Sequence, residues 1–269
     1  MLRGGKIVIT LHNETLKALF SPEQGMTLMS FMMGDIEIID QSTRKPFDTR
    51  RSGLGPLIGP HFHQKKDSAV TFVPDPAQFP HLAHTHSKDP FSHGIARYAP
   101  WQTVTHTATT IDATLSGKDT WNGHTLAELE GQDFTYRFQA TLTPTSLLLD
   151  LSIVSEADSL VGIHYYYHLP PGPASVHTPS QVIPLRENHL DTTHHPHANP
   201  LEGDILLKTA THHLHTRYTS TSQENAWQLY HLKDASFVCI EPVSSQDPRR
   251  PNLTVSSLHI ALTPTQNNV

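Results

Sequence analysis

The stretch 134-FTYRFQATL-142 alternates apolar and polar side chains at every step, and this alternation indicates the fold class. Its apolar positions are Phe134, Tyr136, Phe138, Ala140 and Leu142. Successive side chains of a β-strand point to opposite faces, so these five share one face and the polar residues share the other. The pattern therefore predicts a strand with one buried face.

Further strands are predicted on both sides of this stretch. The segment 145-TSLLLDLSIV-154 follows after only the turn-favouring pair Thr143-Pro144, which predicts an antiparallel hairpin. Other strand segments are Lys6–Leu11, Thr15–Phe20, Met26–Met32, Ile36–Ile39, Ala69–Val73, Gln102–His106, Thr110–Leu115, Val161–His168, Ala226–His231, Ser236–Glu241 and Leu253–Leu262. The best helical segment, Thr125–Glu130, is barely two turns long. So many strands without crossover helices predict an all-β, antiparallel fold, either a large sandwich or a barrel.

Two proline-rich connections, Pro74–Pro90 and Pro170–Pro200, interrupt the strand pattern. Loops of this length without secondary structure of their own tend to be functional or disordered. No internal repeat or shift in composition marks a boundary, so residues 1–269 are predicted to form a single domain.

Composition excludes several classes of protein. Hydrophobic residues make up 36% of the chain and charged residues 16%, which is typical of a globular protein. The net charge is −6, and the basic pairs Lys65-Lys66 and Arg249-Arg250 are too small for a nucleic-acid surface. No membrane-spanning run or secretory signal is seen, and Cys239 is the only cysteine. We therefore expect a soluble, cytoplasmic protein without disulfides and without a membrane or nucleic-acid partner.

The segment 161-VGIHYYYHL-169 places titratable groups on one face of a predicted strand. His164, Tyr166 and His168 share that face. An imidazole beside a phenol could form the wall of a site, but a buried histidine bonded to a neighbour explains the pattern equally well.

The segment 236-SFVCIEPV-243 carries Glu241 directly before a proline that is expected to end the strand ladder. Phe237 and Cys239 share its strand face, which places the carboxylate at the edge of an apolar layer. Such an environment raises the pKa of a carboxyl group, as a general base requires. A glutamate that points into water at the strand end is the alternative.

The 21 histidines outnumber the 19 lysines and arginines and raise the question of a metal site. The pairs and clusters concerned are His61/His63, His84/His86, His213/His215 and His194-His195-x-His197. No carboxylate or cysteine recurs at ligand spacing, so a surplus of polar loop histidines is favoured over a dedicated zinc, nickel or copper site. We expect no metal.

An ordered series of short motifs resembles the aldose 1-epimerase (galactose mutarotase-like) family. The series consists of His93-Gly94-x-Ala96-Arg97-x-x-x-Trp101, Phe134-x-Tyr136-x-Phe138, Gly162-x-His164-x-Tyr166 and Cys239-Ile240-Glu241-Pro242. It covers the chain from about Gly53 to Pro264, and the first motif is most similar to the branch that includes hexose-6-phosphate epimerases. The resemblance implies a large antiparallel β-supersandwich.

The resemblance also implies an isomerase that interconverts the α and β anomers of an aldose or aldose 6-phosphate. A base removes the O1 proton while an acid protonates the ring oxygen, and the opened ring closes again with the opposite configuration. By motif, Glu241 is the base, His164 is the acid and His93 binds near the ring oxygen. No cofactor is implied, and the partner is a small-molecule sugar or sugar phosphate.

Other binding residues are implied less directly. Arg97 matches an arginine that helps to bind a 6-phosphate, although an ion pair with Asp89 is an alternative. Tyr166 and Trp101 could stack on a sugar, or Trp101 could belong to the core. The loop 59-GPHFHQ-64 departs from the family pattern, and Gln64 is expected to bind substrate there. The family's sugar-binding aspartate is Asp191 or Asp204. A non-catalytic carbohydrate-binding protein or a metal-binding β-protein remains as an alternative function.

Overall fold

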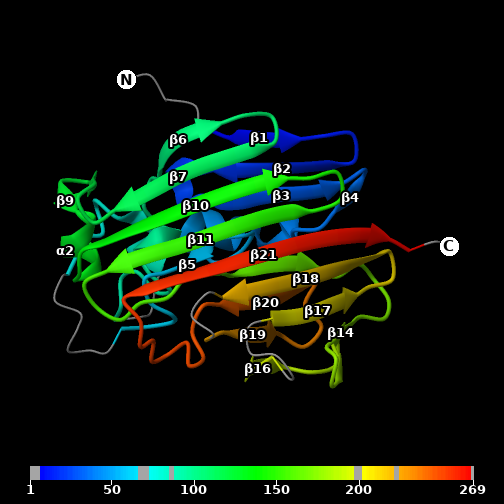
Figure 1. Ribbon diagram of the computed structural model, residues 1–269. Helices are drawn as coiled ribbons and strands as arrows, with labels where there is room; N and C mark the ends of the chain where they lie inside the picture. The colour runs from blue at the N-terminus through cyan, green and yellow to red at the C-terminus, as the bar shows by residue number, and fades with distance from the viewer. Residues whose placement is uncertain (1–6, 66–72, 85–87, 197–201, 221–223, 268–269) are drawn as a thin grey trace.

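A nine-stranded antiparallel sheet spans the molecule in the computed structural model, which describes residues 7–65, 73–84, 88–196, 202–220 and 224–267 (Figure 1). Across the sheet, the strands are β15 (Val182–Pro184), β14 (Ser175–His177), β17 (Glu202–Lys208), β18 (His212–Ser220), β21 (Val255–Gln266), β11 (Leu147–Ser155), β10 (Phe134–Leu142), β7 (Thr110–Ser116) and β6 (Gln102–His106). The predicted hairpin is present as β10 and β11, with Phe138 opposite Leu151. The five apolar residues of β10 are all buried.

Two smaller antiparallel sheets accompany the large one, with a two-stranded pair besides. The six-stranded sheet consists of β16 (Leu190–His194), β19 (Ala226–His231), β20 (Phe237–Val243), β12 (Gly162–Ile163) and β5 (Leu57–Ile58), with β13 (Tyr165–His168) paired to β20. The four-stranded sheet consists of β1 (Ile9–His12), β2 (Leu16–Ser21), β3 (Thr27–Met33) and β4 (Ile36–Glu37), and the pair is β8 (Thr120–Trp121) with β9 (His124–Thr125). The helices are α1 (Arg44–Arg50), α2 (Leu126–Glu130) and the 3-10 turns η1 (Pro22–Gln24), η2 (Gln41–Thr43), η4 (Pro80–His84) and η5 (Ile95–Arg97).

The apolar faces of these sheets pack against one another. Phe20 of β2 meets Phe138 of β10 edge-on, with ring centroids 5.5 Å apart. One cluster of buried hydrophobic residues extends from Ile9 to Leu262 and includes residues of all three larger sheets. Burial on this scale is the main stabilising contribution to such a fold. The prediction of an all-β antiparallel sandwich is confirmed.

Some expectations about individual segments were wrong. The connection Pro170–Pro200 is not a bare loop, since it contains β14, β15 and β16. These strands are short, and Pro184 is tolerated because β15 lies at the sheet edge, where no further strand needs its missing N–H. The strands β17 and β18, and the helix α1, were not expected at all. Of the predicted strand Ala69–Val73, residues 69–72 lie outside the described residues and Val73 is not in a strand.

Pro242 does not end the ladder of β20 as expected. It pairs with Trp227 of β19, and the strand continues to Val243, which pairs with both Ala226 and Gly162. The ladder to β19 continues on both sides of Pro242, through Glu241 with Gln228 and Val243 with Ala226.

Within the described part of the chain, no helix is long and apolar enough to cross a membrane.

Candidate active site

Glu241 lies in the middle of the six-stranded sheet. It belongs to β20, between β19 and β12, and its register partner on β19 is Gln228. The residue is 1% exposed, so the alternative of a strand-end glutamate that points into water is wrong. Burial raises the pKa of Glu241 well above its ordinary value, while the positive charge of Arg97 opposes this shift.

His164 reaches the same place from another part of the chain. It lies at the step between β12 and β13, where its backbone N–H donates to the carbonyl of Pro56 (2.9 Å). Its Nε2 is 3.3 Å from Oε1 of Glu241, and the side chains are 9% and 2% exposed respectively. The pair is therefore below the surface but not sealed from solvent. Burial, followed by the charge of Arg97, lowers the pKa of His164 well below its ordinary value.

His93 stands beside His164, with ring centroids 5.0 Å apart and ring planes nearly perpendicular. Its backbone adopts a left-handed φ of 68°, and its Nδ1 accepts a hydrogen bond from the backbone N–H of His63 (3.3 Å). Gly94 is required next to it, because a Cβ there would lie 1.9 Å from the carbonyl oxygen of Gly59. The His-Gly pair thus allows two loops to touch and sets His93 at the site.

Arg97 ends the turn η5 and is buried, with 4% of its surface exposed. Its Nε and Nη2 have no hydrogen-bond partner among the described residues. The guanidinium lowers the pKa of His93 and of His164, in each case after burial as the larger cause. Arg97 therefore supplies an unpaired positive charge to the cluster of His93, His164 and Glu241.

The aromatic residues differ in their surroundings. Tyr166 stacks on His164 with ring centroids 5.0 Å apart, and its hydroxyl is 3.1 Å from Oγ of Ser52. Trp101 packs edge-on against Tyr136 at 5.1 Å and donates its indole N–H to the carbonyl of Ala96. Since Trp101 is in the core and its polar atom is already bonded, the expectation that it stacks on a sugar is wrong.

Gln64 lies in the loop after β5 and is exposed, two positions beyond buried Phe62. No contact joins it to His164 or Glu241 within the described residues, so the structure places Gln64 apart from the buried cluster.

Of the two aspartates left open, Asp191 lies on the side of the site. It is in β16, where its Oδ1 accepts a hydrogen bond from Nε2 of Gln228 (2.7 Å), the residue opposite Glu241. Asp204 is in the nine-stranded sheet, where it pairs with His215 at 2.5 Å. Asp191 also contributes to the raised pKa of Glu241, behind burial and against Arg97.

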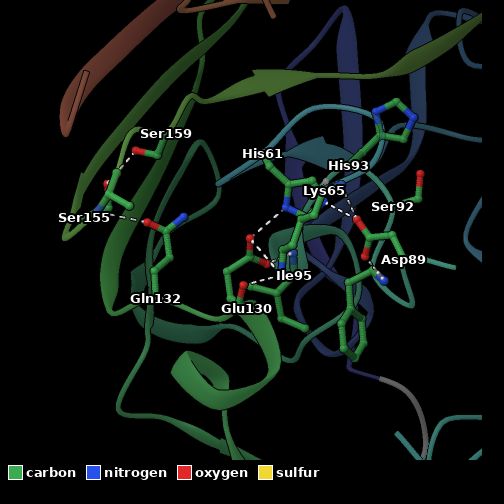
Figure 2. A network of polar contacts seen from close by, with 12 residues as sticks. His61, Lys65, Asp89, Ser92, His93, Ile95, Glu130, Gln132, Ser155 and Ser159 are labelled. Carbon is green, nitrogen blue, oxygen red and sulfur yellow. Dashed lines mark hydrogen bonds and ion pairs between the residues drawn. The ribbon is translucent and has the colours of Figure 1, made fainter. Parts of the chain in front are cut away.

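A second buried cluster of titratable residues holds the neighbouring loops (Figure 2). Nδ1 of His61 is 2.7 Å from Oε1 of Glu130, and its Nε2 is 2.8 Å from Oδ2 of Asp89. The other oxygens accept backbone N–H groups, from Ile95 to Glu130 and from Phe91 to Asp89. Asp89 thus forms its ion pair with His61, and the alternative of an Arg97–Asp89 pair is not observed.

The charges in this cluster support one another. Burial alone would lower the pKa of His61, but Glu130 and Asp89 outweigh it and raise that pKa above its ordinary value. Burial would raise the pKa of Asp89, but the hydrogen bond and charge of His61 lower it to about 2. Because both ring nitrogens face carboxylates, both must donate, and His61 is an imidazolium. Sequence reasoning missed this cluster, since its members are far apart in the chain.

One group of metal-type ligands is found among the described residues, and it is not one of the predicted histidine clusters. The side chains of His164, Cys239 and Glu241 place one donor atom each within 4.8 Å of one another. His86 and His197 lie outside the described residues, while His213 and His215 are on β18.

Comparisons with known proteins agree on the architecture. No family profile and no curated protein matches the sequence. Solved structures do match, among them a galactose mutarotase related enzyme from Lactobacillus acidophilus (TM-score 0.67, 16% identity, 97% of this chain and 98% of that chain). An aldose epimerase homologue from C. elegans gives a TM-score of 0.68 at 14% identity, over 98% and 100%. Galactose 1-epimerase from Lactobacillus acidophilus NCFM gives 0.66 at 11% identity, over 97% and 95%. The chain therefore has the β-sandwich fold of the galactose mutarotase-like proteins.

Proposed function

We propose that this protein is a carbohydrate epimerase that interconverts the α and β anomers of an aldose, with Glu241 and His164 as the proton-transfer pair. The observation that carries the proposal is the approach of His164 Nε2 to Glu241 Oε1 at 3.3 Å, from strands far apart in the sequence. An acid and a base on the same sugar are what anomer exchange requires, and no metal or nucleotide takes part.

The unsatisfied atoms of the cluster support a polar ligand. Nδ1 of His164, Oε2 of Glu241 and Nε and Nη2 of Arg97 are buried without hydrogen-bond partners in the described structure. Buried polar groups are nearly always bonded, and a pyranose carries hydroxyl groups that can both donate and accept. The unpaired atoms are therefore well suited to sugar hydroxyls and the ring oxygen.

Each residue has a definite part in the reaction. Glu241 takes the O1 proton and His164 gives a proton to the ring oxygen, so the bond from C1 to the ring oxygen breaks. After rotation about C1–C2, the ring oxygen attacks the other face of C1 and both protons return. Glu241 must be ionised to start, and Arg97 is the group that lowers its pKa. His93 lies beside His164 and forms a hydrogen bond with the sugar near its ring oxygen.

Charges at the edge of the cluster support an aldose 6-phosphate as one substrate. Asp191, held by Gln228, is an acceptor for sugar hydroxyls. Arg249 is exposed and its charge contributes, after burial, to the lowered pKa of His63, which places it near the loop of His93. An aldose 6-phosphate could place its phosphate there. Arg249→Ala would then raise KM for glucose 6-phosphate but not for glucose, whereas Arg250→Ala serves as the matched control.

Saturation-transfer NMR or polarimetry on α-glucose, α-galactose and glucose 6-phosphate tests the proposal. We expect anomer exchange above the buffer rate with at least one sugar, and its loss in Glu241→Gln and in His164→Gln. Equal rates for the native protein and Glu241→Gln on all three sugars would refute the assignment.

A non-catalytic carbohydrate-binding protein is the second candidate, and one observation favours it. Burial shifts the pKa of Glu241 upward and that of His164 downward, toward the uncharged forms of both groups. An uncharged Glu241 can bind a sugar but cannot take its proton. Sugar binding that persists in Glu241→Gln, without anomer exchange in the native protein, would favour this candidate.

A further inference from the structure

Three donors of different chemistry meet at the candidate site. The donor atoms of His164, Cys239 and Glu241 all lie within 4.8 Å of one another, and all three residues are buried. Cys239 and Glu241 are two positions apart on β20 and so share a face, while His164 comes from the neighbouring chain segment. Strand β20 and the step between β12 and β13 thus hold a set of a thiol, an imidazole and a carboxyl group.

The spacing suits a metal ion better than a hydrogen bond. The 3.3 Å between His164 Nε2 and Glu241 Oε1 is long for a charge-assisted hydrogen bond, which is about 2.7–2.9 Å. Two ligands bound at about 2.0–2.2 Å to one tetrahedral zinc ion lie about 3.3–3.6 Å apart. The sulfur of Cys239 lies within 4.8 Å of a donor atom of each of the other two residues, so it is placed to approach the same ion.

The donor types select the ion. A thiolate favours zinc and similar thiophilic ions, imidazole suits them as well, and magnesium prefers oxygen ligands alone. Three protein ligands leave a fourth tetrahedral position open. Oε2 of Glu241 and Nε and Nη2 of Arg97 are buried without hydrogen-bond partners within the described residues.

We propose that His164, Cys239 and Glu241 form a binding site for a thiophilic divalent cation such as Zn²⁺, which competes with the sugar for the proton-transfer pair. The competition rests on the function proposed above, whereas the binding of the ion does not. A protein whose reaction needs no metal would thereby be inhibited by zinc.

Zinc binding leaves the net charge beside Arg97 unchanged. Burial raises the pKa of Cys239 and of Glu241, which favours their protonated, neutral forms in the metal-free protein. Zinc replaces the S–H and the O–H proton, both of which leave to the buffer, so the total charge beside Arg97 does not change. Affinity must therefore increase with pH, because the ion competes with protons.

Titration with CoCl₂ tests the site directly, since a thiolate bound to Co²⁺ gives a charge-transfer absorption that histidine and carboxylate ligands do not. We expect this band in the native protein, in proportion to one cobalt ion per chain, and its removal by added ZnCl₂. Cys239→Ala should abolish the band and weaken zinc binding, measured by calorimetry, by at least about 100-fold. His213→Ala, which removes a histidine from β18, is the matched control and should keep both.

The remaining outcomes are equally decisive. A native protein without the band, or zinc affinity unchanged in both Cys239→Ala and Glu241→Gln, would overturn the proposal. Circular dichroism checks that each variant is folded. If Cys239→Ala does not fold, the zinc affinity of Glu241→Gln provides the test instead. Zinc should also raise the apparent KM for the sugar without lowering kcat. A band without any epimerase activity would leave the metal site standing and refute only the proposed function.

Discussion

His61 and His164 are two of the histidines that lie next to buried carboxylates, and they differ in how completely their hydrogen bonds are satisfied. His61 has a carboxylate on each ring nitrogen, at 2.7 and 2.8 Å, and the other oxygens of those carboxylates accept backbone N–H groups. His164 has one carboxylate at 3.3 Å, and its Nδ1 has no partner in the described structure. The pKa of His61 is raised, and that of His164 is lowered.

We interpret the His61 cluster as structural and the His164 cluster as the proposed site of chemistry. A buried charge that is fully hydrogen-bonded holds segments together, because each partner compensates for the loss of water. A buried group with free atoms costs stability and persists where a ligand uses those atoms. Proteins commonly place such strained or unsatisfied groups at functional sites. His61 therefore fixes the loops, and His164 is available for chemistry.

Changing the same residue type in both clusters should give opposite results, and the largest effect is expected at Glu241. Glu241→Gln should lower kcat for anomer exchange by about 10²–10⁴-fold, because proton transfer by a positioned group contributes that much. Its thermal stability should stay the same or increase, since a poorly satisfied carboxyl group is removed. Saturation-transfer NMR and thermal melts measure the two effects. Glu130→Gln is the matched variant and should lower the melting temperature. If Glu241→Gln lowers the melting temperature as much as Glu130→Gln does, the two clusters do not differ in the way described.

Removing His61 should cost stability rather than chemistry. His61→Leu leaves Glu130 and Asp89 buried without their shared partner, and we expect a loss of about 3–5 kcal/mol in the free energy of unfolding. Urea denaturation measures this loss. His213→Leu on β18, where the histidine is partly exposed, is the control and should change little.

The pH dependence of the same variant sharpens the comparison. The raised pKa of His61 means that its contribution is fully present below the unfolded value of about 6.5 and is lost as the pH rises through the folded value. The lowered pKa of Asp89 means that its contribution is present above about 3.9 and is lost as the pH falls toward about 2. The stability difference between the native protein and His61→Leu should thus be largest between about pH 4 and 6.5. A difference that grows above pH 8 would contradict an imidazolium at His61.

Arg97 should matter through its charge. Arg97→Met removes the charge that opposes the rise in the pKa of Glu241, so the acid limb of the pH profile of kcat/KM should move to higher pH. If the pH profile of Arg97→Met keeps the native shape and only KM changes, Arg97 binds substrate and does not alter the pKa of Glu241. Arg137→Met, whose ion pair with Asp112 is exposed, is the control.

The smallest effect is expected for exposed pairs on the outer face of the nine-stranded sheet. His259 and Asp150 are in contact there, and about half of each side chain is exposed. His259→Ala should change stability by less than about 1 kcal/mol and leave activity unchanged, because solvent screens such pairs. Thermal melts and anomer exchange check both points; a large loss of activity would indicate that this face takes part in binding.

The sequence predicted those parts of the fold that depend on local pattern. β6, β10 and β19 have the predicted bounds, and in β10 the alternating apolar positions are buried over the whole length of the strand. The strands β14 and β15 span three residues each, which is too short for a period to be recognised. Their pairing depends on β17, a contact across the sheet that no local signal contains.

The candidate site divides in the same way. The convergence of His164 and Glu241 was expected only through a family resemblance, since no local pattern in either segment indicates that the two lie close together. The His61 cluster joins residues 69 and 28 positions apart, and from the sequence Asp89 was considered only as an alternative partner of Arg97. Charge and residue type alone do not show which cation reaches a carboxylate, and in the structure His61 is the one that pairs with Asp89.

The position of β21 has a consequence for how the protein is made. It is the last of the described strands along the chain, yet it lies between β18 and β11 in the interior of the nine-stranded sheet (Figure 1). While the ribosome is still adding these residues, the two halves of the sheet present open edges that nothing in the chain can yet cover. We expect the nascent polypeptide to depend on chaperones until β21 is released, and loss of β21 to yield aggregation rather than a smaller folded protein.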